Sequence, residues 1–127
     1  MYNKKVLEHL EHPRNQGKLK DANGVGVAIS PLCNDPLTFY IKIIEGNIQD
    51  AGFDSDGCGA MIASSSMASE MLKGKSIQDA LSITGRSIAK SLGGLPEAKI
   101  ICAEICQAAI KNAVEDYFKK NYSTDLT

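Results

Sequence analysis

The sequence has no tryptophan, few other aromatic residues and no excess of either charge. Its 14 Lys and Arg residues nearly balance 15 Asp and Glu residues, which gives a formal net charge of −1. This balance argues against nucleic acid or an anionic membrane surface as a partner. No apolar run approaches the roughly 20 residues that a membrane-spanning helix needs. Charged residues also interrupt the apolar stretch that a secretory signal would require. We therefore expect a cytoplasmic protein in a reducing compartment.

Several metal and redox motifs are absent as well. There is no Cys-x-x-Cys pair, which argues against a thioredoxin-type redox centre and a ferredoxin-type cluster run. Neither His-Glu-x-x-His nor Gly-x-x-x-x-Gly-Lys-Ser/Thr occurs. The chain does contain 4 cysteines. In a reducing compartment, these cysteines are more typical of metal ligands or catalytic thiols than of disulfides.

The hydrophobic pattern predicts one domain, residues 1–127, of the α+β class. A short amphipathic helix with Val6, Leu7 and Leu10 on one face is expected first. Alternating apolar residues and short connections then predict a three-stranded antiparallel meander, and helical spacing follows it. A long C-terminal helix is expected after a stop signal at 93–96. The predicted strands are 25–30, 37–43 and 48–55, and the predicted helices are 3–10, 61–74, 76–83, 86–92 and 97–120.

Three cysteines lie at the ends of these predicted elements, where side chains can point out of the core. Cys33 lies in the turn between the first two strands, Cys58 between the third strand and a helix, and Cys102 in the first turns of the last helix. A helix start lowers the pKa of a thiol, so Cys58 should benefit most. Lys99, one turn before Cys102, favours that thiolate too. The spacing alone is equally consistent with buried structural cysteines.

The residues flanking Cys58 are both glycines, Gly57 and Gly59. Glycine lets the backbone adopt unusual angles and leaves space for a bulky group beside the sulfur. Thiolates are the ligands that iron–sulfur clusters and zinc prefer.

Several short segments along the chain form a recognisable pattern: His12-Pro13-Arg14-Asn15, Cys33-Asn34-Asp35, Gly57-Cys58-Gly59 with Ile62-Ala63-Ser64-Ser65-Ser66, Lys73-Gly74-Lys75-Ser76, and the third cysteine after Leu95-Pro96. With these segments, the sequence resembles the IscU/NifU family of iron–sulfur assembly scaffolds nearly from end to end.

The resemblance implies an IscU/SufE-like fold and a nascent cluster held by Cys33, Cys58 and Cys102. It also implies that Asp35 is a ligand and tunes the stability of the cluster. A carboxylate binds iron less well than a thiolate does, so one weak ligand would give an acceptor thiolate a place to enter. A [2Fe–2S] cluster is expected, and a [4Fe–4S] cluster stays open.

Three departures from the family pattern affect these expectations. Ile101 replaces the His that usually precedes the third cysteine, so the fourth ligand must be Asp35, another group or a second subunit. Cys106 shares a helix face with Cys102; it is either a spare ligand and sulfur relay or, as we favour, a buried core cysteine. Glu97 and Ala98 break the Leu-Pro-Pro-Val-Lys segment that an Hsp70-type chaperone binds in the family, which argues against chaperone dependence.

Other polar residues are interpreted as structural or solvated. Ser64, Ser65 and Ser66 have no base beside them and are expected to allow close helix packing. His9 is placed on a solvated helix face and His12 at a turn, and neither is expected to be a ligand.

The leading hypothesis is a scaffold without enzymatic turnover. A cysteine desulfurase would deliver persulfide sulfur to Cys102, iron would bind the thiolates, and apo iron–sulfur proteins would receive the cluster. A homodimer through a shared cluster is one way to complete the site.

The first alternative is a zinc-dependent sulfur-transfer protein, as in the SufU relatives, because three thiolates and a carboxylate suit tetrahedral zinc. The short link at 93–96 argues against it, since those relatives carry an insertion there. Zinc binds such sites more tightly than ferrous iron does, so zinc would also be an adventitious occupant of a scaffold. A metal-stabilised interaction module ranks last.

Overall fold

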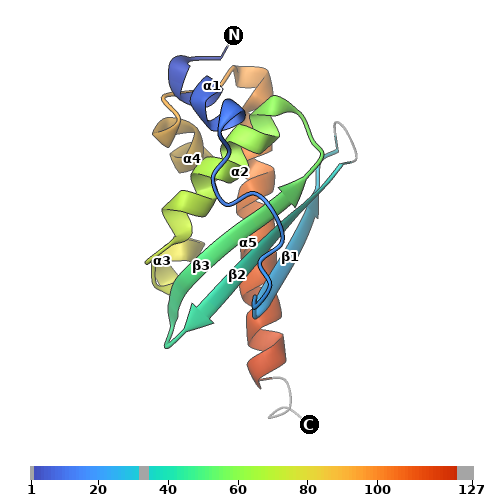
Figure 1. The fold of residues 1–127 in the computed structure, drawn as a ribbon, viewed down its shortest axis with the longest axis vertical. Coiled ribbons are helices and arrows are strands. Elements are labelled where there is room, and N and C mark those ends of the chain that lie inside the picture. Colours follow the sequence, from blue (N-terminus) through green and yellow to red (C-terminus); the bar gives the residue numbers. More distant parts are fainter. Residues whose placement is uncertain (1, 32–34, 123–127) are drawn as a thin grey trace.

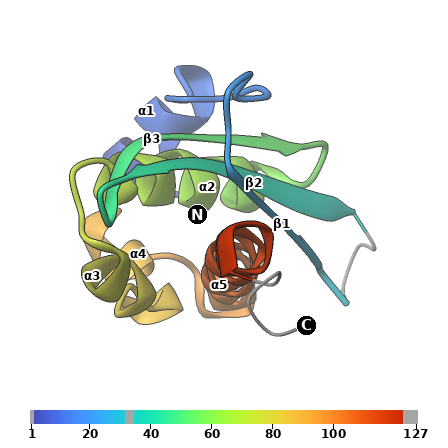
Figure 2. The same cartoon turned by 90° about the horizontal axis from the view of Figure 1, so that it is seen from below.

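The computed structural model describes residues 2–31 and 35–122. Three antiparallel strands form a sheet in the order β1-β2-β3, as the sequence predicted. Helices α2 to α5 lie on one side of this sheet, with the long α5 directly against β1 and β2, and α1 packs on α2 (Figures 1 and 2). The elements are α1 (Lys4–Glu11), β1 (Gly24–Ile29), β2 (Pro36–Ile44), β3 (Asn47–Ser55), α2 (Gly59–Leu72), α3 (Ile77–Leu81), α4 (Gly85–Ser91), the 3₁₀ turn η1 (Glu97–Lys99) and α5 (Ile100–Tyr122).

The core lies between the sheet and the helices. Strand β2 contributes Leu37, Phe39, Ile41 and Ile43, all buried, because every second residue of a strand points to the same face. Helix α2 is buried along most of its length, between α1, α5 and β3. Its buried residues are mostly Ala and Ser, which lets the neighbouring elements approach closely.

Strand β1 has the predicted alternation, and the face that it presents to the core carries glycines. Gly24 and Gly26 point inward, whereas Val27 and Ile29 are 47% and 58% exposed on the outer face. A Cβ atom on Gly26 would lie 2.2 Å from the backbone N of Ala113 in α5. The backbone of α5 therefore occupies the space that an inward side chain would need.

The segment that follows α1 crosses the outer side of the sheet and closes the free edge of β3 (Figure 1). The backbone N–H of Gly17 donates to the carbonyl of Phe53 over 2.6 Å, and the N–H of Phe53 donates to the carbonyl of Asn15 over 3.0 Å. At the other edge, the side chain of Asn112 on α5 donates to the carbonyl of Val27. Both sheet edges thus have partners that limit strand addition.

Within residues 2–31 and 35–122, no helix combines the length and apolar content needed to cross a membrane.

Candidate functional site

The candidate site is built around two cysteines that are 44 residues apart in the chain. Cys58 is the N-cap of α2, and Cys102 is the third residue of α5. Their sulfur atoms lie 3.8 Å from each other, and both thiols are free of disulfide bonds. Two sulfurs that bind one tetrahedral metal ion at about 2.3 Å lie about 3.8 Å apart. The pair is therefore spaced to bind one metal ion together.

Cys58 is the more exposed thiol of the pair. Burial acts to raise the pKa of Cys58, but the hydrogen bonds from the backbone of Met61 and from Cys102, together with the positive charge of Lys99, outweigh it. The pKa of Cys58 is therefore lowered, as expected for a thiol at a helix start. Lys99 favours the thiolate of Cys58, and its expected effect on the thiolate of Cys102 stays a prediction.

Cys102 does not point out of the core as expected, since it is only 4% exposed. Its side chain faces the start of α2, where Cys58 covers it. The expectation that every cysteine of the site faces outward is therefore wrong for Cys102, while Cys58 is half-buried.

The unusual backbone angles expected of the glycines beside Cys58 are not observed, whereas the space they leave for a bulky group beside the sulfur stays a prediction. Neither Gly57 nor Gly59 has a positive φ angle. A Cβ atom on Gly59 would lie 3.2 Å from the side chain of Leu10, so this glycine lets α1 pack against the start of α2. Tyr2 lies close to the same position and, with Lys99, lines a pocket of about 290 Å³.

Asp35 emerges from the sheet at the same end as Cys58. It is half-buried and immediately precedes β2, where Leu37 pairs with Ser55 at the end of β3. Cys58 follows Ser55 by three residues, so the two connections leave neighbouring strand ends. Cys33 lies outside the described residues. The prediction that three sulfurs come together therefore stays a prediction. Among residues 2–31 and 35–122, no three His, Cys, Asp or Glu side chains form a metal-binding group.

Cys106 belongs to the core, as we favoured from the sequence. It is fully buried, and its sulfur lies 3.4 Å from the hydroxyl of Ser65. Burial raises the pKa of Cys106 to about 12, so its thiol is protonated at neutral pH. A protonated, buried thiol is a poor metal ligand and a poor nucleophile.

His9 is a residue whose environment the sequence did not reveal. The predicted solvated position is wrong: His9 is only 6% exposed, and its Nδ1 atom lies 2.7 Å from the hydroxyl of Ser66. That hydroxyl also accepts the backbone N–H of Arg14. Burial, followed by the charge of Arg14, lowers the pKa of His9. Helical spacing alone could not find this, because the buried partner comes from α2.

Two of the segments that carry the family resemblance therefore meet each other. Arg14 and Asn15 bind Ser66 and Ser69 of α2, and Arg14 forms an ion pair with Glu8. Ser64, Ser65 and Ser66 are buried in α2, as expected for residues that allow close helix packing. His12 is exposed where α1 ends. These contacts fix α1 and the segment that follows it against the helix whose N-terminus carries Cys58.

A model of the NifU-like N-terminal domain matches residues 1–124 of the chain. The iron–sulfur cluster assembly scaffold protein IscU 1 of Archaeoglobus fulgidus is 48% identical over 125 residues, which cover 98% of this chain and 82% of that protein. The IscU scaffold protein of Aquifex aeolicus is also 48% identical, over 94% of this chain and 77% of that protein.

Solved structures have the same fold. The N-terminal part of a NifU-like protein from Brucella abortus superposes with a TM-score of 0.70 at 20% identity, covering 93% of this chain and 94% of that one. A SufU-type assembly scaffold from Fervidobacterium islandicum gives a TM-score of 0.60 at 24% identity, covering 98% of this chain and 85% of that one. With its fold, its paired thiols and this match along nearly its whole length, the chain belongs to the NifU-like N-terminal domain family.

Proposed function

We propose that the chain is a scaffold on which an iron–sulfur cluster is assembled from iron and desulfurase-derived sulfur and then passed to apo-acceptor proteins. The 3.8 Å separation of the Cys58 and Cys102 sulfurs supports this proposal most directly. Distant parts of the chain bring the two thiols to one metal-binding distance, and the family relatives are named as assembly scaffolds. The cluster is cargo, so the protein has no turnover of its own.

In this proposal, Cys33 supplies the third thiolate and Asp35 the fourth ligand. Asp35 suits this role because it leaves the sheet beside the connection that carries Cys58. Its carboxylate oxygen would hold iron less firmly than sulfur does, which favours release of the cluster. Cys106 is left out of the ligand set because its thiol is buried and protonated.

We assign receipt of sulfur to Cys102. The Cys102 thiolate would attack the outer sulfur of the desulfurase persulfide, the S–S bond of the donor would break, and the donor cysteine would leave as a thiolate. Because Cys102 is nearly buried, this step requires the start of α2 to move away from it. Cys58 is the competing receiver, since it is more exposed and its pKa is lowered.

Mass spectrometry after one round of desulfurase reaction tests this assignment. The expected product carries one additional sulfur on Cys102 in the wild type and in Cys58→Ser, and none in Cys102→Ser. Persulfide on Cys58 of the wild type would contradict the assignment.

Zinc-dependent sulfur transfer is the second candidate, because the sulfur spacing fits tetrahedral zinc equally well. Anaerobic reconstitution with iron, cysteine and a desulfurase separates the two functions. A scaffold develops the absorption of an iron–sulfur cluster and then activates an apo-ferredoxin. A zinc protein passes persulfide to an acceptor without forming a cluster.

Asp35→Ala is the matched test of cluster release. We expect slower transfer of the cluster to apo-ferredoxin. The variant lacks the weakly bound carboxylate ligand that an acceptor thiolate would displace. Spectra of the loaded variant show whether it still carries a cluster. Transfer at the wild-type rate would contradict the role of Asp35.

Size measurement of the loaded protein, compared with the apo form, tests the proposed dimer through a shared cluster.

A further inference from the structure

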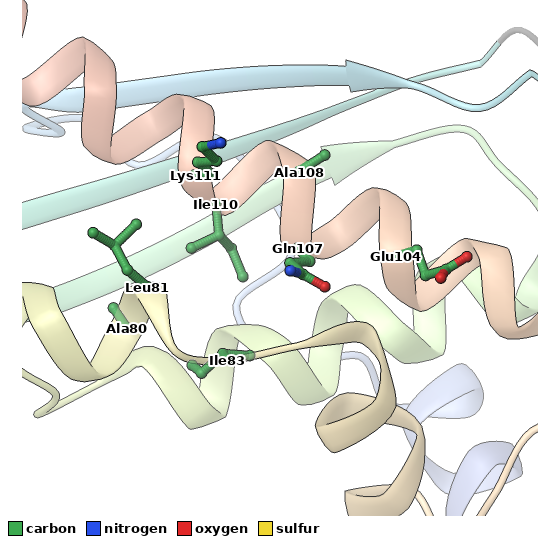
Figure 3. Close-up of a pocket in the computed structure, with 8 residues that line it drawn as sticks. All are labelled: Ala80, Leu81, Ile83, Glu104, Gln107, Ala108, Ile110 and Lys111. Atoms are coloured by element: carbon green, nitrogen blue, oxygen red, sulfur yellow. The ribbon is translucent and has the colours of Figure 1, made fainter.

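A second surface of the molecule, separate from the paired thiols, is a groove between α3 and α5. It has a volume of about 580 Å³ (Figure 3). Its floor is apolar and buried, whereas Leu81 at its rim is 46% exposed. The lining residues are Ala80, Leu81, Ile83, Glu104, Gln107, Ala108, Ile110 and Lys111.

The α5 side of the groove carries one exposed stripe along the helix. Glu104, Gln107, Ala108 and Lys111 are all exposed and follow helical spacing, so they share a face. Glu104 and Lys111 are seven residues apart, which is about 10 Å along a helix, too far for a direct ion pair. In the part of the chain that the structure describes, neither forms an ion pair with another side chain.

We propose that this groove is the interface for a second copy of the chain, with the two α5 helices antiparallel. A two-fold axis between Gln107 and Ala108 would bring Glu104 beside the partner's Lys111, and Lys111 beside the partner's Glu104. The stripe is thus complementary in charge to itself, as an interface between identical surfaces requires. Ala108 lies next to the axis, where its short side chain allows the helices to approach.

The pairing is weak and depends on concentration. Helices that cross by packing their ridges into grooves touch over only a few turns, which matches the stretch from Glu104 to Lys111. The exposed Leu81 of each copy adds apolar area at the rim. Such an interface lies at the lower end of specific interfaces, where dissociation constants are micromolar or weaker.

This dimer differs from one held together by a shared cluster. Cys102 lies between five and six residues from the proposed axis, so the two Cys102 residues would be at least about 16 Å apart. That distance is too great for one cluster, and each copy keeps its own thiol pair. The inference therefore does not rest on the proposed function, and the metal-free protein is sufficient to test it.

Analytical ultracentrifugation of the reduced, metal-free chain from about 10 μM to about 1 mM is the test. The variants are Glu104→Lys, Lys111→Glu, their double variant and an equimolar mixture of the two single variants. Glu11→Lys, an exposed change of equal charge on α1, is the control. Circular dichroism verifies that each variant is folded.

We expect dimers for the wild type, the control, the double variant and the mixture. Each single variant alone should dimerise at least about tenfold more weakly, because it places like charges opposite each other. A wild type that stays monomeric at the highest concentration overturns the proposal. So do single variants that dimerise like the wild type, or a mixture that associates no better than its components.

Discussion

At the scale of single residues, the environment of each sulfur follows from its place in a helix. Cys58 caps α2 and has a lowered pKa, whereas Cys106 lies inside α5 among apolar neighbours and has a raised pKa. The sequence predicted both environments from helix positions. It did not predict the burial of Cys102, because which face of α5 meets α2 depends on tertiary packing.

Alkylation of the reduced apo-protein should follow this order. With iodoacetamide at pH 8, we expect Cys58 to react first because it is the most exposed, Cys102 later, and Cys106 not at all, because its thiol is fully buried and its raised pKa keeps it protonated. Peptide mass spectrometry at successive times measures the order. Full reaction of Cys106 in urea is the control, and labelling of Cys106 as fast as Cys102 under native conditions would contradict its burial.

His9 should make the stability depend on pH. The folded protein lowers the pKa of His9, so below about pH 6.5 the unfolded chain binds a proton that the folded chain does not. The stabilisation is complete above that pH and decreases as the pH falls. Urea unfolding at pH 7.5 and 5.5 measures this.

The variant His9→Gln should have a smaller decrease, because it keeps a hydrogen-bonding group near Ser66 without a titrating ring. His12→Gln is the matched control, since His12 is exposed. An equal loss of stability in wild type and His9→Gln would show that other groups cause the pH dependence.

At the scale of elements, β1 shows what sequence patterns can and cannot predict. The period of two predicted the strand but did not say which of its faces is buried, and Val27 and Ile29 are exposed. Glycine is buried here because the backbone of α5 lies directly against it. A hydrophobicity pattern describes side chains only, so it cannot predict that the backbone of a helix packs directly against the backbone of a strand.

Gly26→Ala should therefore destabilise the domain strongly. The new methyl group would lie 2.2 Å from the backbone N of Ala113 and 2.3 Å from the carbonyl O of Ala109. Backbone cannot move aside as a flexible side chain can, so we expect a loss of about 3 kcal/mol or more. Val27→Ala on the exposed face should change the free energy of unfolding by less than about 0.5 kcal/mol. Urea unfolding of both variants checks this, and a mild effect of Gly26→Ala would contradict the contact.

At the scale of the whole molecule, the predicted class, strand order and long last helix are confirmed. Strand and helix periods are local properties, and short connections between strands allow few arrangements. The site depends on contacts between parts of the chain far apart in sequence. The family resemblance therefore indicated which cysteines to consider, and the fold added the distance between Cys58 and Cys102.

The fold should persist without metal. The core between sheet and helices contains large buried side chains such as Phe39, Phe53 and Leu72, and no metal ion is needed to close it. We expect the circular dichroism and unfolding midpoint of the apo-protein to stay cooperative and native-like after treatment with a chelator. Loss of the folded signal on chelation would instead favour a metal-stabilised module.

The closeness of the Cys58 and Cys102 sulfurs has a practical consequence in air. From 3.8 Å, the two atoms need to approach by only about 2 Å to form a covalent bond. Oxidation by oxygen therefore competes with iron binding for the same two sulfur atoms. In a sample handled in air, we expect a thiol assay to detect two fewer free thiols per chain, and the oxidised protein should not bind a cluster. Dithiothreitol should restore both properties together.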